Sequence, residues 1–256
     1  MIPDHVPSHA APAAHRVLAQ SVFEARAILR NGEQLLLLLI LPVILLFGLS
    51  LTGVLEAIAT PVPAESRIAF AAAGVLGLAL ASTAFTGQAI ATGFDRRYGV
   101  LRQLATTPLG AGGLLWGKLI AVAAVVVVQF AIIGLLAALL GLDSPIAFGA
   151  LAVTAALGTA GMLAWGLLMA GTLRAEATLA LANLAWVLMA SVGGLLFARD
   201  GLWGAVLAWT PFGAIGNSMR AAVVAGSWDG FALLVLAAWT VIGVLLVRRW
   251  FDFNGK

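Results

Sequence analysis

One stretch of the sequence has nearly the spacing of a phosphate-binding loop. Gly112 is followed by four residues and then by Gly117 and Lys118, which is most of the Walker A pattern. The next residue is Leu119, where the pattern needs a Ser or Thr hydroxyl for magnesium, and an apolar run begins there without a preceding strand. We therefore expect no ATP binding by this chain.

Other residue types that carry chemistry are scarce or badly placed. The three His lie near the N-terminus, and the apolar runs contain neither a carboxylate pair nor a His-x-x-x-His spacing. The lack of cysteine excludes disulfides, Cys-ligated zinc, iron-sulfur clusters and Cys nucleophiles. No Gly-x-Ser-x-Gly sequence offers a serine nucleophile. The sequence thus predicts no catalytic residue, no metal site and no enzyme activity.

The composition is that of a membrane protein. Hydrophobic residues make up 62% of the 256 residues and charged residues only 10%, which is far from the globular average. The net charge of +3 reflects a scarcity of charges and not a basic patch, so nucleic-acid binding is not expected.

Uncharged apolar runs long enough to cross a bilayer as helices occur six times. None alternates polar and apolar residues as a barrel strand does. We therefore predict an all-α integral membrane protein whose transmembrane helices cover 35–55, 68–92, 119–140, 146–173, 177–198 and 231–247.

The Lys and Arg residues set the expected orientation, because cytoplasmic segments retain them. Most of them fall in the N-terminal segment, in 93–118, at Arg174 and in the C-terminal tail, whereas Arg67, Arg199 and Arg220 fall on the other side. We expect a multi-pass protein of the cytoplasmic (inner) membrane with both termini in the cytoplasm. The Ala- and Gly-rich spans suggest a bacterial source.

Two segments outside the spans have patterns of their own. Residues 1–13 have no periodic pattern and are expected to be disordered, whereas 14–34 carries an apolar stripe typical of an amphipathic helix on the cytoplasmic surface, or of an ordinary helical lead into the first span. Residues 202–225 are apolar but broken at Thr210-Pro211, and a seventh span there would put the basic tail outside. We predict two short outer-leaflet helices, 202–209 and 212–225.

The longest cytoplasmic loop, 93–118, should contain a short helix with one apolar face. Leu101 and Leu104 lie three residues apart, Phe94 and Val100 fall near the same stripe, and Thr107-Pro108 would end the helix. Such a helix could dock into a groove on a cytoplasmic partner. The alternative is a basic loop that touches anionic lipid head groups.

Polar residues inside the spans are few, and we take Gln88, Gln129 and Asn183 as candidates for a substrate pathway. Hydrogen bonds between helices at small-residue contacts are an equally good explanation of them. The spans contain no acidic residue and hence no visible proton or sodium relay, so energy for transport would come from outside this chain.

The loop and the broken segment together resemble the permease subunits of type-2 ABC exporters, the group that includes daunorubicin-type drug exporters. The first matching pattern is Asp95-Arg96-Arg97-Tyr98-Gly99-Val100-Leu101-Arg102-Gln103-Leu104, followed by Thr107-Pro108-Leu109 and Gly117-Lys118. The second is the turn at Pro211 with Asn217 and Arg220 in the helix after it. Arg97 and Arg102 stand where the family usually has acids, and Val100 replaces a Thr.

The resemblance implies a six-helix permease domain, 35–256, that couples to cytoplasmic ABC ATPase subunits through Asp95, Arg96, Arg97, Tyr98, Gly99, Leu101, Arg102 and Leu104. ATP and Mg would be bound by the partner, and no cofactor by this chain. A second permease chain, identical or different, would enclose the pathway at the dimer seam. We expect export of hydrophobic drugs, lipids or lipid-linked glycans; import, an ion-coupled carrier and a membrane scaffold subunit are alternatives.

Overall fold

The computed structural model describes residues 11–32, 36–55 and 66–251, and the secondary structure in these ranges is helical. Four of the helices there are long and apolar enough to cross a membrane: Arg67–Arg97, Gly110–Leu139, Phe148–Thr172 and Gly230–Trp250. The chain is thus an all-α protein, and its apolar helices indicate that it is embedded in a membrane. Most of the predicted disordered tail lies outside the described residues.

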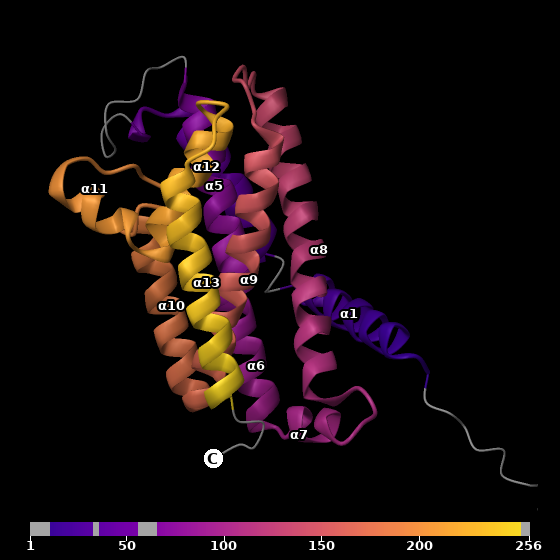
Figure 1. Cartoon of the computed structure of the whole chain (residues 1–256). Helices are drawn as coiled ribbons and strands as arrows, with labels where there is room; N and C mark the ends of the chain where they lie inside the picture. Colours follow the sequence, from indigo (N-terminus) through magenta and orange to yellow (C-terminus); the bar gives the residue numbers. More distant parts are fainter. Residues whose placement is uncertain (1–10, 33–35, 56–65, 252–256) are drawn as a thin grey trace, which may run out of the picture.

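The helix Arg67–Arg97 is the centre of the fold (Figure 1). It consists of α5 (Arg67–Ala81), a π-helical turn η3 (Ser82–Gly87) and α6 (Gln88–Arg97). In its most apolar window 89% of the residues are buried, against 28% in α13 (Gly230–Trp250). A π-helical turn inside an α-helix breaks the regular hydrogen-bond ladder and often marks a functional position.

Small residues let neighbouring helices approach this central helix closely. A Cβ atom on Gly166 of α9 (Phe148–Thr172) would lie 2.7 Å from the Phe85 carbonyl oxygen, and one on Gly74 would lie 2.7 Å from the Leu196 carbonyl oxygen. Because real Cβ atoms do not come so near, glycine is required at both positions. Close backbone approach at small residues is how helices associate in hydrocarbon, where apolar burial gives no driving force.

Two of the predicted spans are shorter in the structure than in the sequence analysis. The span expected at 35–55 consists of η1 (Leu36–Ile40) and α3 (Leu41–Leu51), and Thr52 is already extended. The span expected at 177–198 is α10 (Ala175–Ser191). Its helix ends early because Gly193 and Gly194 follow, the latter with a φ of 80° that favours glycine.

The helix α8 (Gly110–Leu139) begins well before the predicted span at 119, and α1 (Ala13–Arg30) packs against it. The predicted apolar stripe of α1 does not face α8, because Leu18, Val22 and Leu29 are exposed. The face that packs on α8 is instead more polar, and its buried residues are Gln20, Ser21 and Ile28.

The short helices lie at opposite ends of the bundle (Figure 1). At one end α7 (Val100–Ala105) lies between the ends of α6 and α8, and α13 finishes at the same end. Toward the other end are α11 (Gly201–Ala208) and α12 (Pro211–Val223), which closely follow the two short helices predicted at 202–209 and 212–225. The basic ends of α6 and α13 and the start of α10 therefore share the α7 end.

Candidate functional site

The predicted coupling residues lie in two helices and in the turn between them. Asp95, Arg96 and Arg97 form the last turn of α6, so they continue the central helix and do not lie in a loop. Gly99 then adopts a φ of 77°, and α7 begins at Val100. A left-handed glycine after a helix is a common stop signal. It separates α6 from α7, whereas one short helix with Phe94, Val100, Leu101 and Leu104 near the same stripe was expected within 93–118.

The apolar stripe expected to dock on a partner is turned partly inward. Leu101 is fully buried and Leu104 half-buried, and α7 packs on α6 and α8. The exposed residues at this tip include Tyr98, whose ring stacks on Phe94 with 6.2 Å between centroids, as well as Val100 of the predicted stripe, Arg102 and Gln103. A partner can therefore reach Tyr98 and Arg102 without unfolding α7, but it cannot reach Leu101.

Asp95 is part of a cluster of charges that joins three helices. The Lys118 ammonium on α8 is 1% exposed and lies 3.0 Å from both carboxylate oxygens of Glu24 on α1 and 3.6 Å from Asp95 on α6. Gln20 donates a 2.9 Å hydrogen bond to Glu24. A buried charge is tolerated only when it is paired, so this Lys118 cluster fixes α1 against the start of α8. The sequence analysis had not singled out Glu24.

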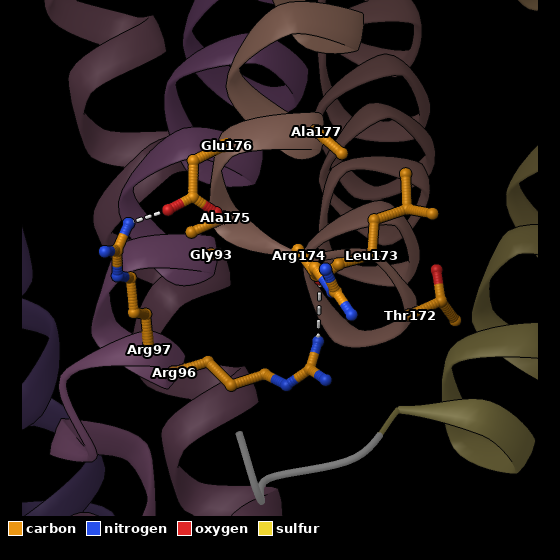
Figure 2. Close-up of a pocket in the computed structure, with 9 residues that line it drawn as sticks. All are labelled: Gly93, Arg96, Arg97, Thr172, Leu173, Arg174, Ala175, Glu176 and Ala177. Atoms are coloured by element: carbon orange, nitrogen blue, oxygen red, sulfur yellow. Dashed lines mark hydrogen bonds and ion pairs between the residues drawn. The ribbon is translucent and has the colours of Figure 1, made fainter. Parts of the chain in front are cut away.

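Arg96 and Arg97 both reach the connection between α9 and α10 (Figure 2). The Arg96 side chain is buried and donates to the carbonyls of Ala170 at 2.7 Å and Leu173 at 3.1 Å, which are free at the C-terminal end of α9. Arg97 forms an ion pair with Glu176 in the first turn of α10. The last turn of the central helix is therefore bonded to α9 and α10.

A hollow of about 580 Å³ lies at this junction, and we call it the arginine pocket. Three arginines and one acid are among its lining residues, which include Gly93, Arg96, Arg97, Arg174 and Glu176 (Figure 2). The sequence indicated Arg174 only as a cation that sets orientation, and it gave no signal for Glu176. A single sequence does not indicate that the end of α6 packs against the connection between α9 and α10.

A second hollow, of about 400 Å³, lies between α8, α9 and α13. Its wall is mostly apolar, with residues such as Leu119, Leu163 and Leu167, and Trp116 and Arg248 also line it. An apolar groove with a cation among its lining residues matches the chemistry of an amphipathic molecule.

The three residues proposed for a pathway have different surroundings. Gln129 is buried in a network between helices, where it donates to the Leu38 carbonyl at 2.5 Å and accepts from Thr83 at 3.0 Å. Gln88 is buried, and its carbonyl oxygen has no partner among the described residues. Asn183 lies on the exposed face of α10. No hydrogen bond joins these three side chains to one another in the described ranges.

Pro211, Asn217 and Arg220, predicted from the segment 202–225, lie in α12, and Arg220 bonds the backbone that follows α10. Pro211 is the first residue of α12, whose N-cap Thr210 accepts from the Gly213 amide at 3.1 Å. Arg220 donates to the Gly194 carbonyl at 2.9 Å and to the Leu195 carbonyl at 3.1 Å. Asn217 accepts from the same guanidinium at 2.9 Å. The arginine thus satisfies two carbonyls of the irregular backbone that follows α10.

Within the described ranges, no group of three or more His, Asp or Glu side chains is placed to hold a metal ion. The fold and these sites define an all-α protein with membrane-crossing helices and polar clusters at both ends of its bundle. No family model matches the chain, and no curated protein matches its sequence.

Proposed function

We propose that the chain is the permease subunit of an ATP-driven ABC exporter of hydrophobic or amphipathic molecules. The observation that supports this most is that the central helix runs to Arg97, directly before the exposed Tyr98, and that α7 with its exposed Arg102 packs on its end. A force applied to this tip acts directly on the most buried helix of the bundle. The ATPase, with its ATP and Mg, would be a separate subunit docked there.

The proposed topology has six spans with both termini in the cytoplasm. The α7 end carries Arg96, Arg97, Arg102, Arg174, Arg248 and Arg249, whereas Arg67, Arg199 and Arg220 lie toward the other end (Figure 1). The tendency of cytoplasmic segments to retain Lys and Arg would put the α7 end inside. The 17 residues of α10 reach about 26 Å at 1.5 Å each, which is short of a bilayer core of roughly 30 Å. Buried Leu195 and Leu196 would complete that crossing, since irregular backbone is tolerated at this depth only when protein covers it.

The helix α1 would lie on the inner membrane surface. Its exposed face carries Leu18, Val22 and Phe23, which α8 does not cover. Burial of these side chains among lipid head groups is favourable for an amphipathic helix. The Lys118 cluster would then connect the surface helix to α6, so that α1 and the coupling tip move together.

A second permease chain would cover the outer face of α10. Asn183 is exposed there beside Leu184 and Val187. A polar side chain facing lipid is costly, and a partner helix that offers a hydrogen bond removes that cost. The groove between α8, α9 and α13 fits a substrate taken from the inner leaflet, because Arg248 lies among otherwise mostly apolar lining residues.

Cross-linking to the partner tests this function. A photoreactive residue at Tyr98, which is 71% exposed, should cross-link in cells to a soluble protein with Walker motifs. The same group at Trp203, 54% exposed near the opposite end, is the matched control and should not. Cross-links from Tyr98 to lipid alone, or to integral membrane proteins alone, would contradict the proposal and favour a carrier or scaffold without an ATPase.

A further inference from the structure

The groove between α8, α9 and α13 is lined by one face of each helix. Its floor is α9, which packs on both neighbours and lies between them (Figure 1). The floor residues have the spacing i, i+3, i+4 and i+7 of a single helix face, and they are Ala160, Leu163, Ala164 and Leu167. The walls come from 112–119 of α8 and 244–248 of α13. The groove is thus one mostly apolar channel that follows a helix.

The two ends of this channel differ in chemistry. The helix α8 begins and α13 finishes at the α7 end, so Gly112 and Arg248 lie at the mouth of the channel that faces that end. The lining residues farther from the mouth are apolar, such as Leu119 and Val244. The α8 wall is about 10 Å long, for seven steps of 1.5 Å each. A cation at the mouth of an apolar channel matches an amphipathic ligand.

The charge at the mouth is positive and open to a ligand. The groove has no acidic side chain among its described lining residues. Arg248 is exposed and forms no hydrogen bond or ion pair within the described ranges. The described acids of this end of the bundle are engaged elsewhere, with Lys118 or with Arg97. An anionic head group is therefore the complement of this mouth, and a cationic one would be repelled.

The α8 wall adds room and a hydrogen-bond donor. A Cβ atom on Gly112 would meet nothing within 4 Å, so the mouth is open beside this residue. Trp116 lines the same wall and is 61% exposed, and its indole makes no hydrogen bond with the described residues. A Trp side chain presents an apolar ring together with one N–H donor, which suits the boundary between lipid tails and head groups.

We infer that this groove binds a single-chain lipid with an anionic head group. The alkyl chain would lie along the α9 floor, and Arg248 would pair with the head group at the mouth. A charge-assisted pair is stronger beside apolar side chains than in water. The volume of about 400 Å³ is near the lower end of ligand pockets, roughly 300–1,000 Å³, so one chain fits better than two.

This inference narrows the substrate class from amphipathic molecules in general to anionic ones. That the bound lipid is the exported substrate rests on the proposed function, whereas its binding needs no ATPase. The two can fail separately. Lipid binding without a cross-link from Tyr98 to an ATPase would keep the site and remove its role in ATP-driven export, and the reverse result would keep the export function and remove the site.

Native mass spectrometry of the full chain, purified without an ATPase in a neutral detergent, tests the site. Three probes with the same chain length differ in head-group charge: lysophosphatidylglycerol is anionic, a monoacylglycerol is neutral and an alkyltrimethylammonium is cationic. We expect the anionic probe to bind most tightly and the cationic probe most weakly, with roughly tenfold or more between them. Retention of no probe, equal retention of all three, or tightest binding of the cation would overturn the inference.

Substitutions of the cation at the mouth test its role. Arg248→Gln should weaken the anionic probe about tenfold and leave the neutral probe unchanged, because only a charged head group uses the guanidinium. Arg248→Glu should bind the cationic probe several-fold more tightly, which is a gain that damage to the fold cannot produce. The matched control is Arg249→Gln, since Arg249 is exposed at the same end but is not among the residues that line the groove. Equal losses in Arg248→Gln and Arg249→Gln would contradict the assignment.

A substitution that fills the mouth tests the channel. Gly112→Leu adds a side chain where the space is open, and Leu is a better helix former than Gly, so the fold should tolerate it. The anionic and the neutral probe should both bind several-fold more weakly, because the added side chain occupies the mouth through which both chains enter. Unchanged binding of both probes by Gly112→Leu would show that the lipid lies elsewhere on the protein.

Discussion

The Lys118 ammonium of α8 lies 3.0 Å from the Glu24 carboxylate of α1, and 94 residues of chain separate the two. Their contact joins the helix that precedes the first apolar run to the helix that follows α7. Asp95, at 3.6 Å from the same ammonium, brings in the central helix. One buried cation therefore joins α1, the end of α6 and the start of α8.

Removal of that cation should destabilise the protein. Lys118→Met leaves Glu24 and Asp95 near one another without a counter-charge, and Glu24 is only 12% exposed. Loss of one partner of a buried pair costs about 3–5 kcal/mol, and the partial exposure of Asp95 lowers the expectation to about 2 kcal/mol. Denaturant unfolding of the purified chain measures the change in free energy.

A double-mutant cycle is the control for this prediction. Glu24→Met in the Lys118→Met background should cost less than Glu24→Met alone, because the pair is already broken. Additive effects of the two substitutions would mean that their contact does not contribute to stability.

The tip at Tyr98 and Arg102, where the proposed ATPase subunit would dock, gives a second prediction, which concerns activity and not stability. Arg102 is exposed and Leu101 is fully buried, so Arg102→Glu should lower transport by the ATPase complex at least about tenfold and leave the melting temperature unchanged. Leu101→Ala should instead lower stability by about 2–4 kcal/mol, because it opens a cavity under α7. Transport assays and thermal unfolding of both variants distinguish these effects, and normal transport by Arg102→Glu would argue against docking at this tip.

Run length predicted the four long apolar helices. The Thr210-Pro211 break, with the orientation of the basic tail, predicted the two short helices at 202–225. Hydropathy did not predict that α6 extends to Arg97, because charged residues at a helix end have the composition of a loop. It also overextended α10, because Gly193 and Gly194 are as apolar as the residues around them. The Lys118 cluster and the arginine pocket depend on packing between distant segments, for which one sequence holds no signal.

Close helix packing gives a third prediction. A Cβ atom at Gly166 would lie 2.7 Å from the Phe85 carbonyl oxygen, so Gly166→Ala should destabilise the protein by about 1–3 kcal/mol. The matched control is Gly134→Ala in α8, where nothing lies within 4 Å of the new atom and a small gain of up to about 1 kcal/mol is expected. Unfolding of the two variants in the same detergent compares them, and similar values for both would show that α9 does not pack this closely on η3.

The backbone after α10 depends on one guanidinium, which gives the last prediction. Arg220→Met leaves the Gly194 and Leu195 carbonyls without their donors, and an unsatisfied buried carbonyl costs about 1–3 kcal/mol. We expect a loss of about 2 kcal/mol and faster hydrogen exchange in 192–200, whereas the α7 end should exchange as before. Asn217→Ala, which removes only an acceptor of the same guanidinium, should cost less. Unchanged exchange in 192–200 with Arg220→Met would mean that helix packing alone holds this segment.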